Sequence, residues 1–125
     1  MSYVERARAL IGTKFRPQGR SAGQGLDCIG LAAIAYRLPP ETVPTGYRSR
    51  GDHGPALVAG LKAHFRPVRK VVSGDLLLLK AGREQVHLVV KTDVGFVHAD
   101  ARLGVVETPG NPPWPLVRAF RRRAR

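Results

Sequence analysis

The N-terminal part of the chain begins with apolar residues at helical spacing. Within Ser2–Gly12, positions three or four apart are apolar: Val4, Ala7, Leu10 and Ile11. Ser2 is followed three residues later by Glu5, the arrangement of a helix capping box. This pattern predicts a first amphipathic helix. The next stretch, residues 13–25, is rich in glycine and polar residues and is expected to be a loop.

Two further apolar stretches also have helical spacing. One begins near Cys28 and stops before the pair of prolines that starts at Pro39, since proline cannot continue a helix. The other spans about residues 55–64, with Phe65 expected on its inner face. Three helices are therefore predicted in the first half of the chain.

After Arg66 the period shortens. The runs VVSGDLLLLK, QVHLVVKT, GFVHAD and GVVETP are apolar stretches separated by glycine, aspartate and charged turns. A short hairpin is expected around Thr92–Gly95. Consecutive strands of this kind favour an antiparallel meander. The chain is thus expected to have an α+β fold, with three N-terminal helices packed on one side of a sheet of about four or more strands.

Length and charge limit the possibilities further. A chain of 125 residues is expected to form one domain over residues 1–125, and its net charge is +12. Part of the excess lies in residues 118–125, RAFRRRAR, which are expected to form a basic tail. Such charge attracts polyanions, but no basic stripe interleaved with aromatics is present, so no specific nucleic-acid partner is predicted. Anionic cell-wall polymers or an acidic partner would be attracted equally well.

Several site types are disfavoured by the sequence. One cysteine permits no intramolecular disulfide and no multi-cysteine zinc site. His53 and His64 lack acidic or thiol neighbours at ligand spacing, so no metal and no cofactor are predicted. No apolar run reaches the roughly 18–20 residues of a membrane span, and the N-terminus lacks the pattern of a secretion signal. Synthesis in the cytoplasm is expected, with export only as part of something larger.

The candidate chemistry lies in three residues. Cys28 stands at the predicted start of the second helix, where unpaired N–H groups and the helix dipole favour a thiolate. His87 and His98 fall in two successive predicted strands. A thiolate with an imidazole is the minimum for nucleophilic acyl transfer, and a third group would orient the imidazole. On the residues alone, a buried structural cysteine and two satisfied strand histidines remain the alternative.

A resemblance adds to this interpretation. The segments GTKFRPQG, GLDCIGL, SGDLLLL, HLVV and FVHA occur in this order between about Ala7 and Glu107. They resemble the motifs of NlpC-type cysteine peptidases of bacterial cell walls. The small form with FVHAD and a GVVE strand is similar to a subgroup encoded in phage and gene-transfer-agent tail gene clusters.

The resemblance implies a papain-like α+β core in which Cys28 is the nucleophile, His87 the general base and His98 the orienting third member. It also implies cleavage of the peptide stems of peptidoglycan, commonly between D-γ-glutamyl and the diamino acid. Asp27 matches an aspartate that helps to seat the free amine of the stem peptide. From the residues alone, an N-cap of the second helix is an equally good interpretation of Asp27.

Two departures from the family pattern concern substrate binding. Phe15 replaces a tyrosine whose hydroxyl is credited with contacting substrate or oxyanion, and Ile29 replaces a serine beside the nucleophile. Loss of one oxyanion donor typically costs about 10²–10³-fold in turnover. The alternative function is therefore a catalytically weak or inactive structural component of a phage-like tail or hub.

Overall fold

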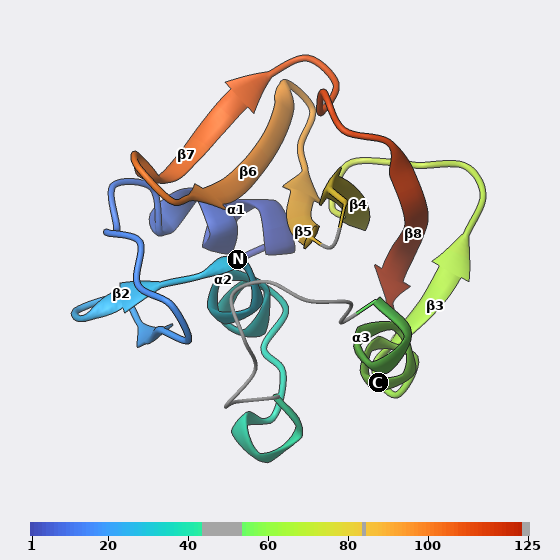
Figure 1. The fold of residues 1–125 in the computed structure, drawn as a ribbon, viewed down its shortest axis with the longest axis horizontal. Helices are drawn as coiled ribbons and strands as arrows, with labels where there is room; N and C mark the ends of the chain where they lie inside the picture. The colour runs from blue at the N-terminus through green and yellow to red at the C-terminus, as the bar shows by residue number, and fades with distance from the viewer. Residues whose placement is uncertain (44–53, 84, 124–125) are drawn as a thin grey trace.

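The computed structural model describes residues 1–43, 54–83 and 85–123. Within these residues, three α-helices and one 3₁₀ turn accompany a sheet that lies mainly in the second half of the chain (Figure 1). The helical elements are α1 (Tyr3–Ala9), α2 (Cys28–Ala35), η1 (Pro40–Thr42) and α3 (Gly54–Leu61). The strands are β1 (Arg20–Ser21), β2 (Gly25–Leu26), β3 (Phe65–Val68), β4 (Leu76–Gly82), β5 (Gln85–Lys91), β6 (Gly95–Asp100), β7 (Gly104–Pro109) and β8 (Leu116–Arg122).

The principal sheet has six strands in the order β3-β8-β4-β5-β6-β7, and every neighbouring pair is antiparallel. The four predicted strands correspond to β4, β5, β6 and β7, which are neighbours in this sheet. The predicted hairpin is present, because the Thr92 N–H donates to the Gly95 carbonyl and the Thr92 hydroxyl accepts from the Gly95 N–H. The observed architecture is a mixed one, with helices on an antiparallel sheet.

The main core lies between the helices and one face of this sheet. Side chains from α1, α2 and α3 meet alternate residues of the strands there, including the fully buried Leu31, Leu78 and Phe120. Tyr36, at the end of α2, contacts Phe65 edge-to-face with ring centroids 5.1 Å apart. Because β-strand side chains alternate between faces, the register of the sheet places every second residue of each strand toward the helices.

The other face of the sheet carries a second, smaller cluster. It contains Leu77, Leu79, Val89, Phe96 and Ala119, with Val68, Val71 and Trp114 packed on it. No described helix contributes to this cluster. The central strands are therefore apolar on both faces, which explains the uninterrupted run of four leucines in β4.

The three expected helices begin close to their predicted starts, but α1 and α3 end about three residues earlier than predicted. Ser2 and Glu5 form the predicted capping box of α1, with hydrogen bonds of 3.0 and 2.9 Å. Helix α3 ends at Leu61, and Phe65 is the first residue of β3 rather than part of a helical face. His53 lies outside the described residues. The expected loop 13–25 contains the short β1–β2 pairing, which lies beside α2 (Figure 1).

The interpretation of residues 118–125 as a tail is wrong for the part that the structure describes. Residues 118–122 belong to β8, which lies between β3 and β4 in the sheet. Ala119 and Phe120 are buried, whereas Arg121 forms a salt bridge of 2.8 Å with the buried Asp75. Arg122 donates to the carbonyls of Tyr36 and His64. Ala119 and Phe120 face opposite sides of the sheet, as successive strand residues do, and the high charge of the surrounding arginines hid this strand in the sequence.

Candidate active site

Asp27 sets the start of α2 and thereby the position of Cys28. Its carboxylate accepts a hydrogen bond of 2.8 Å from the Gly30 N–H, the bond of an N-cap. The same carboxylate accepts from the Gln18 N–H and from the Arg20 guanidinium, each at 2.9 Å. The N-cap interpretation of Asp27 is confirmed. A role in seating a substrate amine stays a prediction.

Two glycines allow the loop before Cys28 to approach the helix. Gly25 has φ of +123°, a conformation that other residues rarely adopt. A Cβ atom on Gly30 would collide with the carbonyl oxygen of Gly19. The backbone behind the first turn of α2 therefore packs directly against the loop. The sequence pattern GLDCIGL thus includes the residues that this turn requires.

The Cys28 thiol is half-buried and is surrounded by backbone N–H groups. Burial raises the pKa of Cys28 to about 11, while N–H groups of Leu88, Cys28 and Ile29 act in the opposite direction. The expectation of a thiol with a lowered pKa is therefore wrong. At the helix terminus the loss of water around the sulfur outweighs the backbone amides, so the neutral thiol is the resting form.

The neighbouring strands separate where the thiol approaches them. Strands β5 and β6 pair only at Val90↔Val97 and Lys91↔Phe96. Toward the start of β5 the pairing is lost, and the Cys28 thiol lies beside the N–H of Leu88. Leu88 directly follows His87 along β5. The separation of the strands thus brings a side chain from the helical layer to the level of the sheet.

His87 and His98 project from the same face of β5 and β6, just beyond the paired residues of these strands. Nε2 of His87 and Nδ1 of His98 are 3.0 Å apart, and the ring planes are nearly perpendicular, at 86°. Both side chains lie on the face of the sheet opposite the helices, with Val89 and Phe96. The hydrogen bond leaves Nδ1 of His87 as the ring nitrogen available for another partner.

Both imidazoles are kept neutral by their surroundings. Burial, with a further contribution from His98, lowers the pKa of His87 to about 4, although Asp100 acts in the opposite direction. Burial also lowers the pKa of His98, again opposed by Asp100. Near neutral pH the site therefore holds a neutral thiol and two neutral imidazoles, one of which can accept a proton.

Within the described residues, no hydrogen bond joins the Cys28 thiol to the His87 ring. The thiol instead lies beside the backbone N–H of Leu88, the residue that follows His87. Hydrogen bonds between catalytic groups are often long without substrate and shorten in the complex. Nucleophilic acyl transfer by Cys28, with His87 as the base, therefore stays a prediction.

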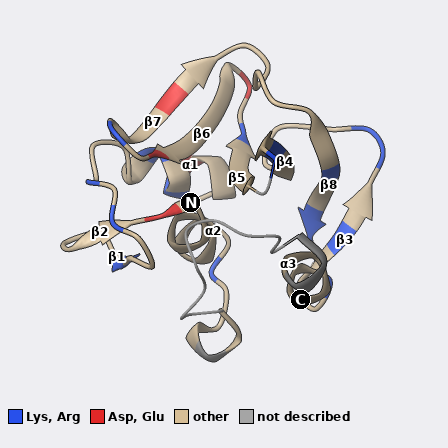
Figure 2. Ribbon diagram, in the orientation of Figure 1, with Lys and Arg blue, Asp and Glu red and all other residues tan. Residues whose placement is uncertain are grey.

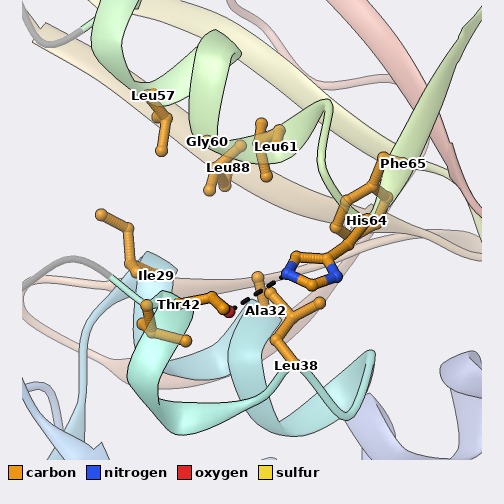
Figure 3. Close-up of a pocket in the computed structure, with 11 residues that line it drawn as sticks. Ile29, Ala32, Leu38, Thr42, Leu57, Gly60, Leu61, His64, Phe65 and Leu88 are labelled. Atoms are coloured by element: carbon orange, nitrogen blue, oxygen red, sulfur yellow. Dashed lines mark hydrogen bonds between the residues drawn. The ribbon is translucent and has the colours of Figure 1, made fainter.

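Phe15 and Ile29 lie on the helix side of the site, and both pack on the main core. Phe15 is bridged to Leu26, just before the N-cap of α2. Ile29 lines a cavity of about 220 Å³ between α2, η1, α3 and β5, shown in Figure 3. The lining is mostly apolar, with Thr42 and His64 as polar members, and Nε2 of His64 is 3.1 Å from the Thr42 hydroxyl. His64 is thus separate from the imidazole pair.

The sequence pattern missed Trp114. It lies in the connection between β7 and β8 and packs against both imidazoles, with ring centroids 5.2 Å from His87 and 5.7 Å from His98. As the one tryptophan of the chain, in the proline-rich segment GNPPWP, it stood out by composition. The contact between Trp114 and the imidazoles could not be predicted without the fold, because Trp114 is 27 residues from His87 in the chain.

Charge is distributed over many elements. Lys and Arg lie on several of them, including the paired strands β3 and β8, whereas one of the few acidic positions is next to the start of α2 (Figure 2). In the described ranges no three His, Cys, Asp or Glu side chains gather as metal ligands. Among the same residues, no helix is long and apolar enough to cross a membrane.

Comparison with known proteins identifies the fold. No family model matches the sequence, and no curated protein matches it either. Among solved structures, the chain is similar to the crystal structure of the NlpC/p60 domain of the peptidoglycan hydrolase SagA, with a TM-score of 0.54 and 19% sequence identity. The match covers 86% of each chain. The chain therefore has the fold of an NlpC/p60 domain.

Proposed function

We propose that this protein is a cysteine peptidase that hydrolyses the peptide stems of bacterial peptidoglycan. Cys28 is the nucleophile, His87 the general base and His98 the residue that orients it. The observation that carries the proposal is the hydrogen-bonded imidazole pair on β5 and β6, next to the strand residue that contacts the Cys28 thiol. The NlpC/p60 fold supports it, as does the peptidoglycan hydrolase named for the similar structure.

The reaction follows from the protonation states. Nδ1 of His87 takes the thiol proton while Sγ forms a bond to the carbonyl carbon of the scissile amide. In this proposal His87 is the tautomer with its proton on Nε2, which donates to Nδ1 of His98 across the 3.0 Å contact. The tetrahedral oxyanion is stabilised by the Cys28 N–H at the start of α2.

His87 then gives its Nδ1 proton to the departing amine as the C–N bond breaks, which leaves a thioester on Cys28. Water attacks this thioester, again with His87 as the base, and the carboxylic acid and the free thiol are released. We infer that the bond cleaved is that between D-γ-glutamyl and the diamino acid. Asp27, Phe15 and Ile29 are assigned to the substrate side of the site.

The route to the wall is the second part of the proposal. The similarity of FVHAD and GVVE to tail-encoded members supports delivery by a phage-like tail after synthesis in the cytoplasm, with tail or hub proteins as partners. A catalytically weak tail component of the same fold is the competing function. The Phe15 side chain, which cannot donate a hydrogen bond, and the raised pKa of Cys28 favour that alternative.

Digestion of purified peptidoglycan tests the enzyme directly. Wild-type protein and the Cys28→Ala variant are incubated with walls of several diamino-acid types, and soluble fragments are identified by mass. Stem-peptide fragments from the wild type only are expected, and their masses reveal the bond. The isosteric Cys28→Ser variant controls for loss of packing around the sulfur. Absence of fragments with every wall type would instead support the structural tail component.

A further inference from the structure

The outer side of the imidazole pair is covered by one side chain. The half-buried Trp114 contacts His87 and His98 edge-to-face, with interplanar angles of 77° and 62°. It also contacts Phe96, with ring centroids 6.2 Å apart, and Phe96 itself lies against His98. Four aromatic rings thus form one cluster on the face of the sheet that the described helices do not cover.

The connection that carries Trp114 is fixed at both ends. The Gly110 N–H donates to the Val94 carbonyl in the β5–β6 turn, at 3.1 Å. The Pro115 carbonyl accepts from the Lys80 N–H of β4, at 2.9 Å. Between these anchors, two prolines precede the indole and restrict the backbone. Trp114 is therefore held by the same sheet that carries the two histidines.

We propose that Trp114 is a positioning residue for the imidazole pair: its indole holds the two rings in hydrogen-bonding geometry and keeps water from their outer side. The catalytic consequence rests on the proposed function, whereas the effect on the two rings does not. Edge-to-face aromatic contacts favour one relative orientation, so the indole restricts rotation of both imidazoles. A correctly oriented His87 is what proton transfer from Cys28 requires.

The groups around His87 and His98 indicate that Trp114 is the side chain whose truncation tests this role. Asp100 is the charged residue acting on both rings, and it favours their protonated forms. Strands β4 and β8 present the apolar Leu77, Leu79 and Ala119 to the same cluster. Burial is the first cause of the lowered pKa of each histidine. Exposure of the rings by truncation of the indole should therefore raise both values.

The test combines Trp114→Ala, the conservative Trp114→Phe and the control Leu116→Ala at the exposed start of β8. Imidazole titrations are followed by NMR. In Trp114→Ala the midpoint of His87 should rise from about 4 by about one unit or more toward its ordinary value of 6.5. Trp114→Phe should restore most of the shift, and Leu116→Ala should leave the titration unchanged.

Two readouts complete the design. Because Trp114 is the sole tryptophan, its fluorescence in the wild type should fall as the adjacent imidazoles protonate, which needs no variant that might fail to fold. In peptidoglycan digestion, Trp114→Ala should lower kcat by up to about a hundredfold with little change in KM. Unchanged histidine titrations in a folded Trp114→Ala protein, or pH-independent wild-type fluorescence, would overturn the inference. Absence of wild-type hydrolysis would instead count against the proposed function.

Discussion

The two faces of the sheet have different roles, although both are apolar. The helix-covered face holds the large core, and Cys28 comes from that layer. The opposite face has a small cluster that includes the surroundings of His87 and His98. The separation of β5 and β6 brings the thiol of the first layer to the backbone of the strand that carries His87. The proposed site is thus formed across a sheet rather than within one layer.

The position of Cys28 and His87 between apolar layers explains why both groups are neutral. A site formed within apolar layers loses water on both sides, so burial dominates the pKa of Cys28 and of His87 in opposite numerical directions. Both shifts favour neutral groups. The same burial that stabilises the fold therefore sets the proposed catalytic mode, in which His87 removes the thiol proton during attack.

The largest expected effect is on the outer-face histidines. His87→Ala should lower peptidoglycan hydrolysis by about 10⁴-fold or more, because it removes the proposed base. His98→Ala should lower it by about 10²-fold, because His87 then lacks its orienting partner. Fragment release from purified walls is the measurement. His64→Ala is the matched control on the helix side, and equal activity of all three variants would contradict the assignment.

Truncation of one phenylalanine on each face distinguishes the two layers. Phe120 on the helix side and Phe96 on the outer side are both fully buried. Each alanine variant should lose about 3–5 kcal/mol of unfolding free energy, measured in urea. Only Phe96→Ala should also lower the activity of the remaining folded protein, because Phe96 contacts His98. An equal loss of specific activity in Phe120→Ala would remove the distinction.

The outer face should also make stability depend on pH. The His87 pKa is about 4 in the folded protein and about 6.5 when unfolded, so between these values the unfolded chain binds more protons. Unfolding free energy should therefore fall as pH is lowered from 6.5 to 4.5, by roughly 2–3 kcal/mol. Urea titrations across this range test it. The His87→Gln variant should show a smaller slope, and an unchanged slope would assign the effect elsewhere.

The reactivity of Cys28 tests the helix-side burial. With a pKa of about 11, its thiolate fraction at pH 8 is about a hundredfold below that of an ordinary thiol. Alkylation by iodoacetamide should therefore be slower than in the urea-unfolded chain by about that factor and should accelerate up to about pH 11. Faster labelling of the folded protein near pH 7 would show that the backbone amides outweigh burial.

The sequence by itself determined the local structure around the proposed site. The Ser2–Glu5 capping box, the Asp27 N-cap and the β5–β6 hairpin each depend on residues within a few positions of one another. The pairing of His87 with His98 is also short-range, because one tight turn between two alternating strands places them on the same face. Such features need only local hydrogen bonds and periodicity.

Only the tertiary structure decided what depends on distant neighbours. Residues 118–122 became a strand because β3 and β4 offer them free edges and Asp75 offers Arg121 a buried partner. The direction of the Cys28 pKa reversed because burial under the sheet, which no local pattern records, exceeded the effect of the helix terminus. Trp114 joined the imidazoles through a connection between two later strands. Desolvation and long-range pairing are properties of the packed molecule, so they appear only when the layers are assembled.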